Sequence, residues 1–510
     1  MNPQAKKSYG QILKSSAIIG GSSLVGIVIG AVRTKAMALM LGPSGVGLLG
    51  VYTSILDLAK GIAVVGAGTS GVREIADAAG RGDSAAFSRT VLTLRRLLII
   101  SGILCLLLFV VLSGLISKAS FGDAGHSTSL MVLATAVILS AVSTGQMAVV
   151  RGVRRMADLA RMNIFGACYG LIISLPLIYF YRESGIVPSL VCAAAMGALA
   201  SWWYGRKVQI EAVELTWPQF SQETANILKL GLVFLSIMLM SLGVAYLVRI
   251  IVVRRLGVEA AGYYQAAWTV GALYVMSILE MMGADFLPRL SAVSKSTVNC
   301  IQVVNEQVEV NMLIGGPGVI ATLSFSPLVI LVFYSDKFGP ATEVLRWICL
   351  GMSLRVASWP MGYMLIAKNA RGVVFWSELL NRSLELGLIW ICIRLFGLVG
   401  AGIGFFVSCV FYWFLIYSIV RHKYGFGWSA NNKRIGLIYG SFILAGFSVW
   451  YLLPHAVVIT GGTLVTLVAG YCSLKALCAL LPFERLPRLA QETLALFRLA
   501  PITMADVDAP

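Results

Sequence analysis

Apolar segments of helix length recur along this chain and limit what it can fold into. An α-helix needs about 20 mainly apolar residues to cross a bilayer, and each segment is close to that length. Only 12% of the 510 residues are charged, whereas a soluble protein carries about 25%. We therefore predict an all-α polytopic membrane protein. The fourteen segments lie at about 15–40, 46–70, 94–116, 128–150, 162–181, 186–204, 228–253, 259–287, 310–334, 343–367, 374–395, 399–420, 435–453 and 457–480.

The first six segments and the next six resemble each other at a nearly constant shift. A shift kept over about 200 residues indicates an internal duplication. Because each copy has an even number of helices, both copies enter the membrane with the same orientation. We predict two pseudo-symmetric six-helix lobes, which form a core of twelve transmembrane helices, and two additional C-terminal helices. Four residue pairs are 215 positions apart: Gly42 and Gly257, Gly47 and Gly262, Gly185 and Gly400, and Arg206 and Arg421.

Polar stretches divide the chain into regions. The longest polar stretch before residue 420 separates the two sets of six segments. After residue 481, apolar residues recur at helical spacing among arginines, as in an interfacial helix, and a disordered tail is the alternative. The predicted regions are an N-terminal lobe (1–205), a cytoplasmic linker (206–228), a C-terminal lobe (229–424), an extra two-helix segment (425–481) and an amphipathic or disordered cytoplasmic tail (482–510).

The net charge of +17 raises the question of a nucleic-acid partner. Membrane proteins collect Lys and Arg in their cytoplasmic loops for topological reasons, so we expect no nucleic acid. With the N-terminus inside, most of the Lys and Arg residues between the segments fall on the cytoplasmic side. This asymmetry predicts that the N-terminus and the C-terminus are both cytoplasmic.

The sequence motifs argue against a nucleotide-binding site, a nucleophilic active site or a metal site. Residues 66–71 fit the pattern GxGxxG, but a dinucleotide site needs a strand before the pattern, and here a predicted spanning helix precedes it. Helix packing or a hinge is the better interpretation. The sequence contains no Walker A motif and no nucleophile elbow. Its three histidines and nine cysteines are scattered, so we expect no metal site, no cofactor and no enzyme.

Charged residues inside the apolar segments are the candidates for function. A charge at the bilayer centre costs at least about 2.5 kcal/mol, so such residues usually face a wet cavity or a partner. Arg33, Lys60, Arg249 and Arg355 form a cationic surplus, which suits an anionic ligand such as phosphate. For Arg33 and Arg249, snorkelling to the head groups is the alternative, and their repeat-related positions favour the cavity.

Acidic residues lie in some of the same segments. Asp57 precedes Lys60 by three residues, so the two share a helix face and can neutralise each other. We expect Asp57 and Glu280 to serve ion coupling or gating, with a proton or sodium as the coupling ion. Residues 378, 382 and 385 are Glu, Arg and Glu on one helix face, which we interpret as a solvated ladder. Two lobes with a charged seam and no ATP-binding motif predict a secondary transporter.

Three short motifs, in their order and spacing, carry a family resemblance over about residues 10–424. They are Leu41-Gly42-Pro43-Ser44-Gly45-Val46-Gly47-Leu48, Phe286-Leu287-Pro288-Arg289-Leu290-Ser291 and Gly362-Tyr363-Met364-Leu365-Ile366-Ala367-Lys368. The chain resembles the Wzx-type polysaccharide flippases of the multidrug/oligosaccharidyl-lipid/polysaccharide exporter superfamily, in particular the O-antigen and enterobacterial common antigen translocases. It departs from their usual twelve helices by adding two.

The resemblance implies a function and a location. Such proteins flip undecaprenyl-diphosphate-linked oligosaccharides to the periplasmic leaflet of the bacterial inner membrane, by alternating access around a cationic cavity. The implied partners are the undecaprenyl-diphosphate-linked glycan, membrane lipids, a polysaccharide polymerase and a chain-length regulator. A lipid II flippase is the first alternative, because those members have fourteen helices, and a multidrug or cation antiporter is the second. An oligosaccharide polymerase or a glycosyltransferase would carry a large outer loop or an acidic metal-binding motif, and the outer loops here are short.

Overall fold

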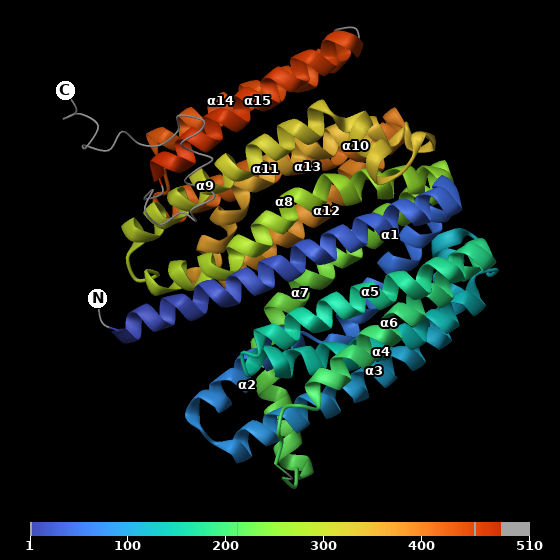
Figure 1. Cartoon of the computed structure of the whole chain (residues 1–510), viewed down its shortest axis with the longest axis vertical. Helices are drawn as coiled ribbons and strands as arrows, with labels where there is room; N and C mark the ends of the chain where they lie inside the picture. Colours follow the sequence, from blue (N-terminus) through green and yellow to red (C-terminus); the bar gives the residue numbers. More distant parts are fainter. Residues whose placement is uncertain (1–2, 212, 453–454, 481–510) are drawn as a thin grey trace, which may run out of the picture. The chain divides into compact units, whose positions relative to one another are not determined.

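The computed structural model describes residues 3–211, 213–452 and 455–480 (Figure 1). Within these ranges the chain is helical and contains no strand, so the predicted all-α class is confirmed. The helices are α1 (Pro3–Val64), α2 (Ala67–Arg81), α3 (Ser84–Phe121), α4 (Ser127–Gly152), α5 (Met156–Tyr181), η1 (Arg182–Gly185), α6 (Ile186–Gly205), α7 (Trp217–Leu256), α8 (Val258–Ala292), α9 (Thr297–Ser324), α10 (Ser326–Phe333), η2 (Asp336–Phe338), α11 (Ala341–Ala367), α12 (Arg371–Phe396), α13 (Leu398–Tyr424), α14 (Ala430–Leu452) and α15 (His455–Leu480).

Seven helical stretches in the described ranges are long and apolar enough to cross a membrane, or eight if α9 and α10, bent by 86°, form one span. Two of these stretches each combine two predicted segments: Met156–Gly205 contains both of its segments, and Val25–Val64 includes parts of 15–40 and 46–70. The helices α11 and α12 fall outside this set and carry several charged residues in their interiors. The count of fourteen spans, like the division into five regions, stays a prediction.

The backbone repeats at the predicted shift of 215 residues. The helices α5 and α12 begin 215 residues apart, at Met156 and Arg371, and end 215 residues apart as well. Left-handed backbone angles recur at the same distance, which confirms the duplication in the turns and not merely in the helices. The paired φ values are 66° and 92° at Gly42 and Gly257, 57° and 55° at Arg154 and Asn369, and 52° and 59° at Arg182 and Gly397.

The turns that begin at Gly42 and Gly257 touch each other. A Cβ atom on Gly47 would lie 2.1 Å from the carbonyl oxygen of Val258. A Cβ atom on Gly262 would lie 1.9 Å from the carbonyl oxygen of Pro43. Val258 follows Pro43 by the repeat distance, so the contact is reciprocal. Backbones approach this closely only where both residues lack a side chain.

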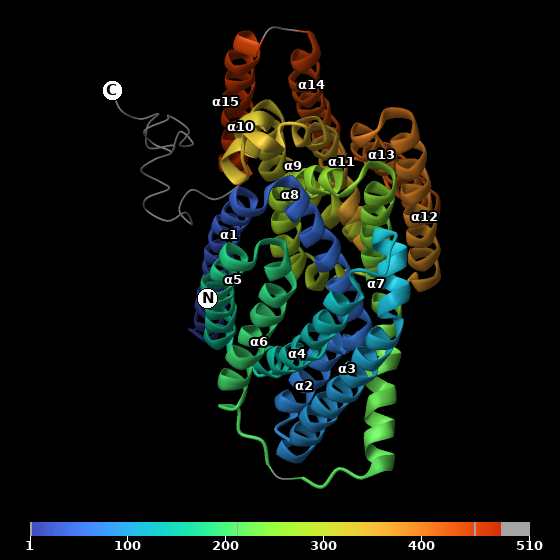
Figure 2. The ribbon, with the colours of Figure 1, turned by 90° about the vertical axis from the view of Figure 1, so that its right-hand side faces the viewer.

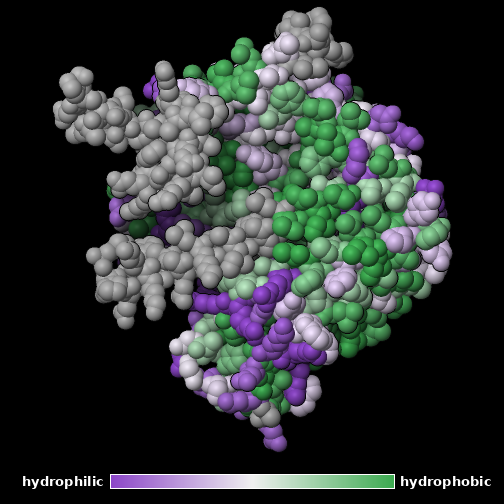
Figure 3. All heavy atoms as spheres, in the orientation of Figure 1, coloured by the Kyte–Doolittle hydropathy of each residue, from purple (hydrophilic) through white to green (hydrophobic). Residues whose placement is uncertain are grey.

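Helix contacts divide the chain into two compact units. The first comprises Met1–Ala266, Leu331–Gly339 and Glu378–Ala401. In it α3, α4, α5 and α6 pack as neighbours, and α1 runs beside α5 (Figure 2). One face of α3 exposes a row of aliphatic side chains, which suits contact with lipid. Figure 3 shows broad hydrophobic areas and a hydrophilic region toward the end where α2 lies.

The second unit comprises Ala267–Ile330, Pro340–Ser377 and Gly402–Pro510. Here α9 contacts α11 and both appended helices, α14 and α15. The ring of Tyr439 on α14 packs on Gly316 of α9, where a Cβ atom would lie 2.5 Å from the ring. Leu313, Ile320 and Ala469 join Tyr439 in a buried cluster. The appended helices therefore bury apolar surface of α9.

Candidate functional site

A break in α1 positions the candidate site. Gly42 has φ 66° and ψ −171°, a conformation that is essentially confined to glycine. Pro43 follows and has no backbone N–H, so the helical hydrogen bonds are interrupted at this point as well. The break divides α1 into two halves, and residues of both halves line one cavity.

This cavity has a volume of about 420 Å³ and lies within the first unit. The lining side chains from the second half of α1 recur every three or four residues and therefore share one helix face. Arg33 and Lys60 are the two charged residues in the lining. The lining consists of Gly30, Arg33, Thr34 and Met37 before the break, Leu49, Thr53, Leu56 and Lys60 after it, and Leu190, Ala193 and Ala194 of α6.

The two cations differ in how they are compensated. The Nε atom of Arg33 is buried and has no hydrogen-bond partner among the described residues. A buried donor without a partner costs about 1–3 kcal/mol, so this guanidinium would gain from an anionic ligand. Lys60 lies 3.6 Å from Asp57, and both side chains are partly exposed, at 33% and 46%. Such a pair contributes at most about 1 kcal/mol. Asp57 therefore leaves Lys60 available to a ligand.

Arg249 lies in the same unit but is held by the protein. Its Nε donates to Gln265 Oε1 at 2.9 Å, and its Nη1 donates to the carbonyl oxygen of Ala245 at 2.8 Å. The residue is 9% exposed and interacts electrostatically with Asp57. Arg249 is absent from the cavity lining, so the structure brings together two of the four predicted cations and places a third near their acidic neighbour.

Arg355 and Glu280 belong to the second unit. The Arg355 guanidinium lies 5.9 Å from the ring centre of Phe405, a cation–π contact, and the residue is half-buried. Glu280 is exposed and interacts electrostatically with Tyr363. Neither residue lines the cavity that contains Arg33 and Lys60.

The interpretation of residues 378, 382 and 385 as a solvated ladder is wrong. Arg382 Nη1 lies 2.7 Å from Glu385 Oε2, and Arg382 Nε lies 3.5 Å from Glu378 Oε2. The three side chains are 8–15% exposed. Tyr264, which is buried, interacts electrostatically with both Arg249 and Glu385. The signal in the sequence was the spacing of three charges on one face inside an apolar segment.

The GxGxxG pattern lies at a helix break, as expected for a hinge. Val65 and Gly66 have φ values of 49° and 70° and separate α1 from α2. The described residues contain no group of three or more His, Cys, Asp or Glu that could hold a metal ion.

The comparisons with known proteins agree with this fold. The family described as "Polysaccharide biosynthesis protein" matches residues 36–343. The Lipid III flippase of Escherichia coli (strain K12) is 23% identical over 419 residues, which cover 79% of this chain and 97% of that protein. The Lipid III flippase of Shigella flexneri matches to the same extent.

Two kinds of solved structure share the fold. The lipid II flippase MurJ in an inward closed conformation matches with a TM-score of 0.68 at 12% identity, over 90% of this chain and 99% of that one. An inward-facing multidrug resistance MATE family transporter of the MOP superfamily matches with a TM-score of 0.66 at 15% identity, over 78% and 95%. The chain therefore has the helical fold of this superfamily.

Proposed function

The chain belongs to the polysaccharide biosynthesis protein family, and from this premise we propose that it flips a lipid-linked oligosaccharide across the bacterial inner membrane. The proposed substrate is an undecaprenyl-diphosphate-linked repeat unit of an O-antigen, exopolysaccharide or capsule. The similarity to Lipid III flippases over most of the chain supports a lipid-linked glycan as the substrate class. Transport rather than catalysis is the proposed activity, with alternating access as the mechanism.

The observation that carries this proposal is the cavity lined by Arg33 and Lys60. A diphosphate head group must leave water during transport and needs compensating positive charge. Arg33 supplies a planar fork of donors with an unpartnered Nε, and Lys60 supplies a compact charge. We propose that both contact the diphosphate, that Arg249 and Arg355 add positive potential, and that Asp57 and Glu280 take part in ion coupling or gating.

Two alternatives predict other cavities or substrates. A lipid II flippase is compatible with the match to 99% of the MurJ chain and with the appended helices α14 and α15. A multidrug antiporter that accepts cations would need acidic residues in its cavity, whereas the charged residues that line this cavity are both cations. A lipid II flippase differs from the proposed function in its substrate. A multidrug antiporter is disfavoured by the positive charge of the cavity lining.

The test is complementation of surface polysaccharide production in a host that lacks its own flippase, at matched expression. Arg33→Ala and Lys60→Ala should each lower transport about tenfold, because a charge-assisted hydrogen bond is worth about 1.5–3 kcal/mol. Arg33→Lys should restore transport incompletely, since Lys cannot bind a phosphate bidentately. Lys118→Ala, an exposed cation at the end of α3, is the control and should be active. Full activity of Arg33→Ala, Lys60→Ala, Arg249→Ala and Arg355→Ala would refute the cationic cavity.

The orientation is proposed from the distribution of Lys and Arg. Both termini face the cytoplasm in this proposal, and a polysaccharide polymerase and a chain-length regulator are the proposed protein partners. Reporter fusions after Arg206, Arg421 and Pro510 should all report the cytoplasm. A periplasmic signal from the fusion after Pro510 would contradict the count of fourteen helices.

A further inference from the structure

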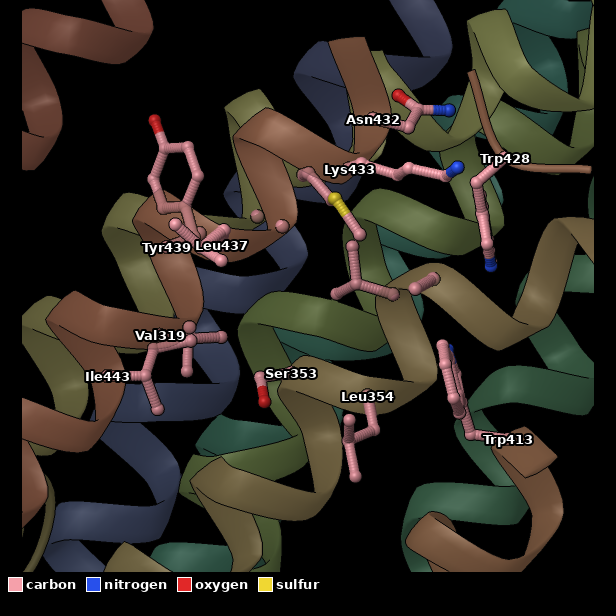
Figure 4. Close-up of a pocket in the computed structure, with 17 residues that line it drawn as sticks. Val319, Ser353, Leu354, Trp413, Trp428, Asn432, Lys433, Leu437, Tyr439 and Ile443 are labelled. Atoms are coloured by element: carbon pink, nitrogen blue, oxygen red, sulfur yellow. The ribbon is translucent and has the colours of Figure 1, made fainter. Parts of the chain in front are cut away.

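A second cavity lies within the second unit, at the surface that α14 shares with α9, α11 and α13 (Figure 4). Its volume is about 400 Å³. Val319, Leu354, Ala357, Leu437 and Ile443 make most of its wall apolar. A mainly apolar cavity of this size with a few polar groups is the usual form of a small-molecule site. Nothing in the proposed transport reaction uses it.

Three polar residues that line the cavity lack partners for some of their atoms. The indole Nε1 of Trp428 is buried and has no hydrogen-bond partner among the described residues. The same holds for Oδ1 of Asn432, a residue that is 3% exposed. Lys433 is exposed and forms no ion pair within the described part of the chain, and Figure 4 shows its side chain extending toward Trp428.

The position of the indole is set by stacking. The Trp428 ring lies nearly parallel to the rings of Trp413 and Tyr417, with interplanar angles of 6° and 4°. The amide of Asn432 is oriented by its Nδ2, which donates to the carbonyl oxygen and the Oδ1 of Asn305, both at 2.9 Å. Both groups are therefore held in place, while one polar atom of each has no partner among the residues that the structure describes.

These atoms define the chemistry of an occupant. The buried Trp428 N–H and Asn432 oxygen have no hydrogen-bond partner among the described residues, which is unfavourable, and an occupant of the cavity can remove this cost. The Trp428 N–H and the Lys433 ammonium call for an anionic acceptor, and the Asn432 oxygen calls for a hydroxyl donor. The apolar wall calls for a hydrocarbon chain. Glu309 of α9 lies outside the lining, and its carboxylate accepts a hydrogen bond from Asn431.

We propose that this cavity binds an anionic phospholipid of the bilayer with a hydroxylated head group, of which phosphatidylglycerol is the simplest. The phosphate contacts Lys433 and the indole N–H, a head-group hydroxyl donates to Asn432, and one acyl chain follows the apolar wall. The proposal is independent of the transported substrate. It explains why α14 carries a lysine in the lining of an otherwise apolar cavity.

The test is native mass spectrometry of the purified full-length protein, titrated with dioleoyl-phosphatidylglycerol or with dioleoyl-phosphatidylcholine. The unsubstituted protein should prefer the anionic lipid. Lys433→Gln should lower its affinity about tenfold, and Trp428→Phe, which keeps the ring and removes the donor, about fivefold. Arg434→Gln is the matched control, because Arg434 is exposed and outside the lining, and it should change the affinity less than twofold.

A further variant tests the acyl chain. A Cβ atom on Gly440, which lines the cavity, meets no atom within 4 Å, so the side chain of Gly440→Leu starts in open space and narrows the cavity. It should weaken dioleoyl-phosphatidylglycerol and leave dihexanoyl-phosphatidylglycerol unchanged. Equal losses in Lys433→Gln and Arg434→Gln would show surface attraction alone and overturn the proposal. So would equal affinity for the two dioleoyl lipids, tighter binding of undecaprenyl phosphate, or displacement of the lipid by millimolar inorganic phosphate.

Discussion

The two copies of the repeat share a backbone and differ in charge. Their turns have the same left-handed glycine at the same point, and the two turns contact each other reciprocally. The cavity cation Lys60 corresponds to Val275, which is buried, and its partner Asp57 corresponds to Ala272. The Asp57–Lys60 pair is therefore a property of the first copy and not of the repeat.

The reverse difference separates α5 from α12. The buried ion triad of α12 corresponds in α5 to uncharged residues, namely Asn163, Ala167 and Gly170. Both copies need the same backbone geometry at the turn, because in each copy the chain reverses there and contacts the turn of the other copy. A charge within an apolar segment is costly wherever it stands, so a charge that is needed in one copy need not be kept in the other. The comparison shows that the two copies keep the same backbone turns but place their charged residues at different positions.

The triad of α12 is expected to give the largest effect. Arg382→Met leaves two carboxylates without their shared cation, which should lower the free energy of unfolding by about 3–5 kcal/mol. The measurement is unfolding by titration with sodium dodecyl sulfate. Arg371→Met, at an exposed position of the same helix, should change it by less than about 0.5 kcal/mol. Equal effects of the two variants would show that the triad is solvated after all.

The reciprocal contact should give an intermediate and symmetrical effect. Gly47→Ala and Gly262→Ala each press a methyl group against a backbone carbonyl of the other copy, and each should cost about 1–3 kcal/mol of unfolding free energy. Gly243→Ala on α7, where a Cβ atom meets nothing within 4 Å, is the control and should be neutral or slightly stabilising. A large effect of only one of the two substitutions would contradict a reciprocal contact between the copies.

The smallest effect is expected where the first copy departs from the second. Arg154 has a left-handed φ of 57°, and the second copy has Asn369 with the same angle. Asn tolerates this conformation better than other residues with a side chain. Arg154→Asn should therefore raise the unfolding free energy by up to about 1 kcal/mol, measured in the same titration. Asn369→Arg should lower it by a similar amount, and no change in either variant would mean that the turn is unstrained.

Patterns along the sequence predicted the helices, the duplication and two of the charged residues that line the cavity. The length of an apolar segment and a constant shift between two sets of segments can both be read from the sequence alone. Neither requires knowledge of how the helices pack. Arg33 and Lys60 were predicted as cavity residues by their position within apolar segments, and the structure places both in one lining. The roles assigned to them in transport stay predictions.

The features that the sequence did not predict depend on contacts between residues far apart in the chain. Arg249 looks equivalent to Arg33 in the sequence, but Gln265 and a carbonyl oxygen hold it. The triad of α12 was misjudged because its burial depends on neighbours such as Tyr264, more than one hundred residues away. The cavity beside α14 combines residues from four helices and the loop before α14, and no single stretch of sequence contains its pattern.

The contact between Gly47 and Gly262 has a consequence for how the two copies evolved. Where residues of the copies touch, a gain of side chain on either partner meets the backbone of the other, so neither position can drift alone. The corresponding positions Lys60 and Val275, by contrast, have diverged. Similarity between the two copies is thus expected to persist longest at the positions where residues of one copy contact residues of the other.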